Sequence, residues 1–156
     1  MCRRRSKLWP LLCLLVVGAG CDHGRVYHSY QPIGEDGWDR RDTFVFQFPC
    51  MPDSTGRIDL SLCLRVCPQP LWRHLAVGVE YHLTSPDTLY RDTFLVALSD
   101  SAGFNPKAGS SLLQYNHPMA SFEAGRLQGA TLRVFHLMRR ETLRRVTDVG
   151  IRAEQR

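Results

Sequence analysis

The stretch Ile58–Val66 reads Ile-Asp-Leu-Ser-Leu-Cys-Leu-Arg-Val, and it decides the fold class. Asp59, Ser61 and Arg65 lie between aliphatic side chains that fill every second position: Ile58, Leu60, Leu62, Leu64 and Val66. Successive side chains of a strand point to opposite faces of its sheet, so this alternation predicts a strand with one buried face. Cys63 is expected on the polar face.

Similar alternation recurs along the chain between turns rich in Gly, Pro and Asp, at Thr43–Phe48, His74–Leu83, Asp92–Leu98, Thr131–Met138 and Val146–Ala153. Six to eight strands with one polar face each predict a mainly β protein with a single antiparallel β-sandwich domain. We expect its core to include Phe44, Phe46, Leu60, Leu62, Leu64, Val77, Val79, Phe94, Val96, Leu132 and Val134.

Two stretches stand outside this pattern. Ser99–Pro118 contains several Gly and Pro residues and predicts a long loop, with at most a short strand near Leu112–Tyr115; loops of this length are often functional. Leu137–Arg145 is compatible with a helical turn or a hairpin loop, and carries the basic cluster Arg139, Arg140, Arg144 and Arg145. We nominate the long loop and the arginine segment as contact surface.

The N-terminus has the order of a secretory signal peptide. A basic segment, Met1–Lys7, leads into the apolar run Leu8–Val17, then into small residues that precede Cys21. The run is too short for a membrane-spanning helix, which needs ~20 residues. The segment resembles the lipidation site of bacterial lipoproteins, and this predicts acyl chains such as palmitate on Cys21. We therefore expect a signal peptide at 1–20, a lipid-anchored tether with a first short strand at 21–40, and the β-sandwich at 41–156.

The charge of the chain does not favour nucleic-acid binding. The chain holds 20 Lys and Arg against 15 Asp and Glu, a net charge of +5. Four of the basic residues and none of the acids precede Cys21, so the remainder is close to neutral. A near-neutral domain gains little from counterion release on a phosphate backbone.

No catalytic, cofactor-binding or metal-binding residues can be assigned from motifs. Gly-x-Ser-x-Gly, His-Glu-x-x-His, a Gly-rich phosphate loop and an Asp-x-Asp calcium pattern are all absent. His136 falls on an apolar strand face, which predicts a core histidine hydrogen-bonded to backbone. His74 and His82 lie on a polar face, ~26 Å apart at strand spacing, and cannot share a metal. We therefore expect that the protein is not an enzyme.

The cysteines that follow Cys21 are odd in number, so Cys50, Cys63 and Cys67 cannot all pair internally. Cys63 and Cys67 are ~13 Å apart on an extended strand, beyond the reach of a disulfide. Cys50 could bond to one of them if two strands are adjacent. We expect free or half-paired thiols.

Both ends of the chain after Cys21 resemble the gliding motility lipoprotein GldH family of the Bacteroidetes. The opening residues that carry the resemblance are Cys21-Asp22, Arg25-Val26-Tyr27, Tyr30 and Gly37-Trp38. The closing residues are Val134-Phe135-His136-Leu137-Met138-Arg139 and Val146-Thr147-Asp148-Val149-Gly150-Ile151-Arg152, with Asp92-Thr93 ahead of an apolar stretch between the two ends.

The resemblance implies a non-enzymatic cell-envelope lipoprotein that supports gliding motility or the assembly of the type IX secretion machinery. Its implied partners are envelope proteins of that apparatus, together with a membrane reached through the N-terminal lipid. Only Asp22 is acidic just after Cys21, which favours a periplasm-facing protein. The alternative is a lipid-anchored β-sandwich that binds glycans or nutrients. Its candidate aromatic platforms are Trp38, Trp72, Phe104 and Tyr115, although Trp38 is interpreted first as a packing anchor.

Overall fold

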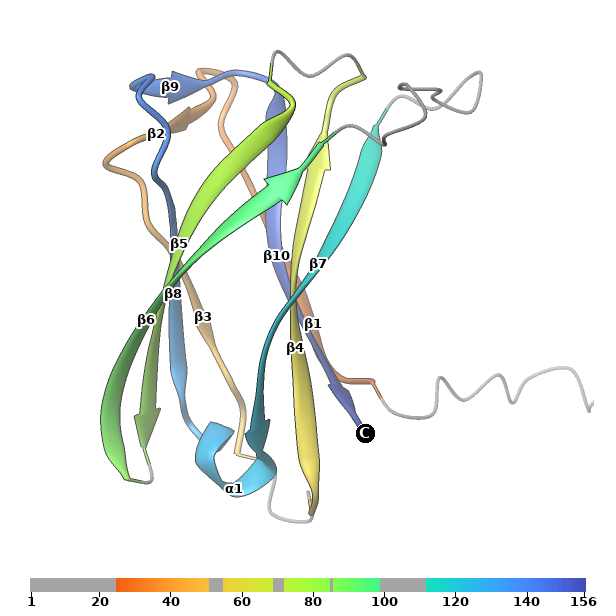
Figure 1. Cartoon of the computed structure of the whole chain (residues 1–156), viewed down its shortest axis with the longest axis vertical. Coiled ribbons are helices and arrows are strands. Elements are labelled where there is room, and N and C mark those ends of the chain that lie inside the picture. Colours follow the sequence, from red (N-terminus) through yellow and green to blue (C-terminus); the bar gives the residue numbers. More distant parts are fainter. Residues whose placement is uncertain (1–24, 51–54, 69–71, 85, 99–111) are drawn as a thin grey trace, which may run out of the picture.

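The computed structural model describes residues 25–50, 55–68, 72–84, 86–98 and 112–156, and these fold into two facing four-stranded antiparallel sheets (Figure 1). The β4 sheet contains, in spatial order, β1 (Arg25–Pro32), β10 (Val146–Gln155), β4 (Arg57–Val66) and β7 (Leu113–Glu123). The β5 sheet contains β3 (Phe44–Gln47), β8 (Thr131–His136), β5 (His74–Thr84) and β6 (Asp87–Ala97). The prediction of a mainly β, antiparallel fold is confirmed.

Two small elements complete the fold. β2 (Trp38–Asp39) and β9 (Thr142–Leu143) form a two-stranded sheet at one end of the sandwich. One helical turn, α1 (Ala124–Leu127), lies at the other end, between β7 and β8. No helix in the described ranges is long and apolar enough to cross a membrane.

The core lies between the two sheets, where the alternating patterns predicted it. The aliphatic positions of β4 are all buried, and β4 pairs with both β10 and β7. The remaining expected core residues are buried too, except that Phe44 and Phe94 are half-buried and pack against the core. Cys63 lies on the outer face, as strand parity predicts, yet it is fully buried there.

Side chains also join the two sheets along their edges. On one side Tyr27 of β1 packs on Phe48, with ring centroids 4.6 Å apart, and the Gln31 amide donates to the Val45 carbonyl at 2.6 Å. On the opposite side, His117 of β7 packs on Phe94 of β6 with centroids 5.6 Å apart.

Two predicted boundaries are wrong. The expected loop Ser99–Pro118 is strand from Leu113 onward, because β7 runs through Pro118 to Glu123 and pairs with β4. Proline is tolerated on an edge strand, where its missing N–H is not required by a neighbour. Residues 99–111 of that loop lie outside the described residues. The strand expected at Asp92–Leu98 begins five residues earlier, at Asp87.

The Leu137–Arg145 segment is a loop that contains β9, and it holds no helical turn. Cys50, Cys63 and Cys67 are free thiols. His74 and His82 are exposed on β5, as their polar face predicts.

Candidate functional site

The opening and closing segments of the described chain contact each other at two places, and one of them is the outer face of the β4 sheet. β1 pairs with β10, and this register places Tyr30 opposite Gly150. The Tyr30 ring lies across the glycine so closely that a Cβ on residue 150 would stand 2.6 Å from the ring carbon Cδ1. Gly150 therefore provides the space that the tyrosine fills.

Tyr30 extends over the next strand as well. The Arg65 guanidinium stacks 4.0 Å from the centre of the Tyr30 ring, and Cys63 lies close enough to affect the tyrosine hydroxyl. Burial, followed by the influence of Cys63, raises the pKa of Tyr30 to about 12. The ring covers the outer face locally, which accounts for the burial of Cys63 among polar neighbours.

The two ends meet again around Trp38, which is fully buried. Its ring makes edge contacts with His136, at 5.3 Å between centroids, and with Phe44, at 5.5 Å. The indole N–H donates to the Asp42 carbonyl at 3.3 Å. The interpretation of Trp38 as a packing anchor is thus confirmed, and a fully buried ring offers no platform to a sugar.

His136 is a core histidine, as its strand face predicts, and only 1% of it is exposed. Its ring nitrogens approach backbone groups of Glu141 and Trp38, but neither of them meets the geometry of a full hydrogen bond. Burial lowers its pKa. Removal from water disfavours the charged imidazolium, so the ring is neutral near pH 7.

Residues 36–42 and 138–144 form a surface at this end of the sandwich that we call the cap. β2 and β9 pair Trp38 with Leu143. Arg40 adds two further links, since its backbone N–H donates to the Glu141 carbonyl at 2.7 Å and its guanidinium to the Met138 carbonyl at 2.6 Å. Gly37 has a φ of 94°, and a Cβ there would lie 2.8 Å from the Leu143 carbonyl oxygen. The backbone of the cap is held at several points.

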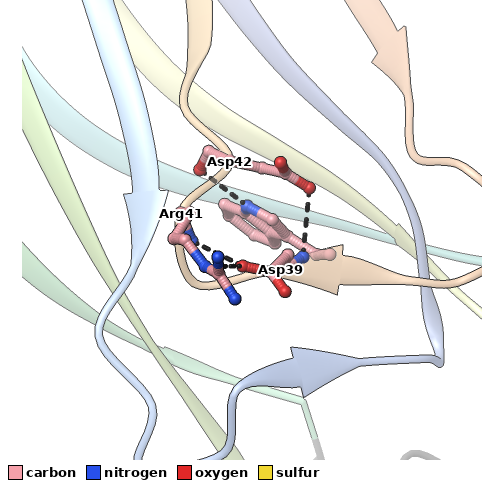
Figure 2. Close-up of polar contacts among 4 residues, drawn as sticks. Asp39, Arg41 and Asp42 are labelled. Carbon is pink, nitrogen blue, oxygen red and sulfur yellow. Dashed lines mark hydrogen bonds and ion pairs between the residues drawn. The ribbon is translucent and has the colours of Figure 1, made fainter.

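The carboxylates of the cap are used to hold its own turn (Figure 2). One oxygen of Asp42 accepts the Asp39 backbone N–H at 3.2 Å. One oxygen of Asp39 accepts the Arg41 backbone N–H at 2.8 Å and lies 3.5 Å from the Arg41 Nε. Within the described part of the chain, no group of three or more His, Cys, Asp or Glu side chains could hold a metal ion.

The outer surface of the cap is open and charged. A shallow depression of about 550 Å³ is lined by Asp36, Asp39, Asp42, Arg41 and Arg144 among others. Arg139, Arg140 and Arg144 are exposed, and their side chains form no ion pair or hydrogen bond with any residue in the described ranges.

Arg145 differs from the other arginines nominated with it. Its guanidinium donates to the Pro68 carbonyl at 3.3 Å, and its own carbonyl accepts the Cys67 N–H at 2.8 Å. Arg145 therefore helps to hold the segment in place, and the free charges are Arg139, Arg140 and Arg144.

The sequence model of the GldH lipoprotein family matches residues 25–153, which include every strand from β1 to most of β10. This chain belongs to the GldH lipoprotein family. The name of the family suggests a gliding-motility-associated lipoprotein, which would be a membrane-anchored envelope protein. In this GldH family member, the contacts Tyr30–Gly150 and Trp38–His136 join the opening and closing segments that carry the resemblance.

Two solved structures show remote likenesses to this GldH family member. Dimeric latent PorU from Porphyromonas gingivalis is 11% identical with a TM-score of 0.34, over 88% of this chain and 14% of that one. The VP2 subviral particle of infectious bursal disease virus is 12% identical with a TM-score of 0.22, over 85% of this chain and 39% of that one. The chain thus spans a minor part of both proteins, and neither likeness bears on fold or function. No curated protein matches it.

Several predicted site residues are not brought together. Cys21, the expected lipid attachment residue, lies outside the described residues, as does Phe104. Trp72 and Tyr115 are half-buried against the core, and the Tyr115 hydroxyl donates to the Leu98 carbonyl at 2.6 Å. Sequence reasoning missed the Tyr30–Gly150 contact, although a glycine inside a strand pattern is a known signal of close approach.

Proposed function

We propose that this protein is a non-enzymatic envelope lipoprotein that supports the gliding or type IX secretion machinery by binding other envelope proteins through the cap. In this proposal acyl chains on Cys21 hold it on a membrane, and its domain faces the periplasm. The observation that carries the proposal is the group of three unpaired arginines, Arg139, Arg140 and Arg144, on a backbone that is fixed by several links.

Folding does not account for the charges of these arginines, since their side chains form no ion pair or hydrogen bond with another described residue. A backbone that is already held loses little conformational freedom when a partner binds, and preorganisation of this kind favours affinity. Complementary charges also steer the encounter and select the partner. The arginine segment of the cap therefore suits an acidic patch on a folded protein.

The position of the cap relative to the membrane anchor agrees with this role. β1 starts at the end of the sandwich where β10 finishes, with Arg25 opposite Glu154. The cap lies beyond the other end of β1, where Pro32 pairs with Asp148 (Figure 1). At about 3.3 Å per residue, the seven steps of this eight-residue strand separate its ends by roughly 23 Å. A partner bound at the cap leaves the lipid free to insert.

The glycan-binding alternative has less support. Three of its four candidate platforms are buried or half-buried, and the cap depression is lined mainly by charged side chains. Sugar-binding sites use exposed aromatic faces, whereas Trp38 is fully buried and Trp72 and Tyr115 pack against the core.

A charge-reversal pair tests the proposal. The variant with Arg139→Glu and Arg140→Glu should keep its stability within about 0.5 kcal/mol, as exposed substitutions usually do. It should also lose envelope partners in crosslinking and pull-down from membranes, and the wild-type association should weaken with added salt.

The control reverses Arg57 and Arg156, two exposed arginines at the start of β4 and just after β10, whose guanidinium groups contact the Ser121 carbonyl and Asp59. It changes the net charge equally and should retain the partners. Urea unfolding checks that this control stays folded. Equal partner lists for the cap variant and the wild type would rule out the cap as the binding surface. Hydrolysis of a glycan or peptide by the purified protein would rule out a non-enzymatic role.

A further inference from the structure

Within the described ranges, the edge strand β6 lacks the shortness, bulges and prolines that often protect a free sheet edge, and the exposed Asp92 on its inner face is its main protective feature. Exposed edges are normally shortened, bulged or interrupted by proline, because their unpaired backbone groups invite another strand. In this sandwich β3 has only four residues, while β1 and β7 each contain a proline and a register shift. β6 has eleven residues, contains no proline and pairs with β5 without a shift.

β6 also exposes large apolar side chains. Leu89 is 56% exposed and Leu95 is 62% exposed, both on the outer face of the β5 sheet. On the inner face of the same strand, Tyr90 is 42% exposed and Asp92 is exposed. At a long, straight edge with exposed apolar side chains, a second strand would bury apolar surface and also form hydrogen bonds with the free backbone groups.

The hydrogen-bonding pattern shows which backbone groups are available. Leu98, which directly follows β6, donates its N–H to the Arg73 carbonyl at 2.8 Å. In an antiparallel pair, bonding alternates from residue to residue, so even-numbered residues of β6 bond to β5. The N–H and C=O groups directed away from the sheet therefore belong to Leu89, Arg91, Thr93 and Leu95.

On the two sides of Asp92, β6 carries residues of the same chemical class at matching distances. Its neighbours match outward as Arg91 with Thr93, Tyr90 with Phe94, Leu89 with Leu95, and Thr88 with Val96. These matches are polar with polar, aromatic with aromatic, leucine with leucine and β-branched with β-branched. An antiparallel strand with this symmetry complements a second copy of itself.

We propose that two copies of this protein pair through β6, antiparallel, with the two-fold axis at Asp92. The β5 sheets of both copies then join into one continuous sheet. Each Leu89 lies opposite the partner's Leu95, which covers the exposed leucines of both copies. The two Asp92 residues face each other in a non-hydrogen-bonded position, and they are the one unfavourable match in this register.

Disulfide capture at Asp92 tests both the pairing and its register. The full chain is produced with Cys50→Ser and Cys67→Ser, which remove the two accessible native thiols among the described residues. In a non-hydrogen-bonded pair the two Cα atoms lie about 4.5 Å apart, within the range of a disulfide. Asp92→Cys should therefore give a covalent dimer in membranes under mild oxidation, seen on a non-reducing gel.

Arg91→Cys is the matched control, since it lies on the same strand and is equally exposed. In the proposed register the two copies of residue 91 are diagonal neighbours about 7–8 Å apart, at or beyond the limit for a disulfide. Capture at both positions, at neither, or to a protein of another size would overturn the proposal. Adding Leu95→Lys should abolish capture at residue 92, whereas Val45→Lys, on the other edge of the sheet, should leave it intact.

A second measurement does not depend on cysteine. Removing the like charges with Asp92→Asn should strengthen self-association about two- to fivefold in sedimentation of the detergent-solubilised chain, because opposed like charges destabilise a strand pair. The cap arginines are not part of this surface, so the variant with Arg139→Glu and Arg140→Glu should dimerise like the wild type. Unchanged or weaker association of Asp92→Asn would contradict the register.

Discussion

At the scale of single residues, each sheet places an aromatic ring over a glycine on its outer face. Tyr30 lies across Gly150 in the β4 sheet, and Phe135 lies across Gly78 in the β5 sheet, where a Cβ would stand 2.5 Å from the ring. A glycine in a strand lacks a side chain to pack, and a neighbouring aromatic ring compensates for that loss. Phe135 belongs to the closing segment of the family resemblance, as Gly150 does.

Gly150→Ala should destabilise the protein by about 1–3 kcal/mol, the usual cost of overpacking. The new methyl group would meet the Tyr30 ring and the Ser29 carbonyl oxygen, which lies 2.8 Å from the ideal Cβ position. The measurement is urea unfolding of the variant and the wild type.

Gly34→Ala is the control, because nothing lies within 4 Å of its Cβ position. Combining Gly150→Ala with Tyr30→Ala should cost less than the sum of the two single changes, since one clash is removed. Strict additivity would mean that the ring and the glycine are not coupled.

Residue identity alone gave only part of this picture. Strand parity placed Cys63 on the correct face, but it carries no information about Tyr30, which arrives from a strand far away in the sequence and buries the thiol. For the same reason the arginines of the basic cluster looked alike. Only the fold separates Arg145, which is bound to Pro68, from the free Arg139.

At the scale of elements, β4 behaves as the central strand that its alternation predicts. It is hydrogen-bonded on both sides, and Leu62 is fully buried between the two sheets. Leu62→Ala should therefore cost roughly 2–5 kcal/mol, the range found for buried leucine truncations.

Thermal or urea unfolding measures this cost, and Leu137→Ala serves as a comparison because Leu137 is 44% exposed. That second change should cost much less, since little buried surface is lost. Similar losses for both leucines would contradict the position of β4 in the core.

Strands with strict alternation were predictable, and those whose regularity depends on tertiary context were not. β7 carries His117 on its inner face and Pro118 within its length, so its sequence reads as a loop. Pairing with β4 makes it a strand regardless. β2 and β9 have two residues each, too few for any pattern, and Trp38 of β2 packs against His136 of β8.

At the scale of the whole molecule, the proposed anchor can be tested by one substitution. Cys21→Ser should release the protein from the membrane fraction into the soluble fraction, because stable anchoring depends on buried acyl chains. Mass spectrometry should find acyl groups on Cys21 as the N-terminus of the wild-type protein.

The serine variant should unfold at the same denaturant concentration as the wild-type domain, since residue 21 precedes the first described strand. A wild-type protein with an intact Met1, or a serine variant that stays in the membrane fraction, would contradict the lipid anchor.

The early start of β1 sets how the molecule would stand on a bilayer. Residue 25 already belongs to the β4 sheet, and the covalent path from Cys21 to Arg25 spans at most about 14 Å. A lipid on Cys21 would therefore hold the β4 sheet close to the membrane surface. In the proposed β6 pair, both β4 sheets lie on the same side of the joined sheet, so the Cys21 lipids of both copies reach one membrane. The pair would lie flat on the membrane, with its two caps pointing in opposite directions parallel to the bilayer surface. Each cap would then meet proteins that are anchored to the same leaflet.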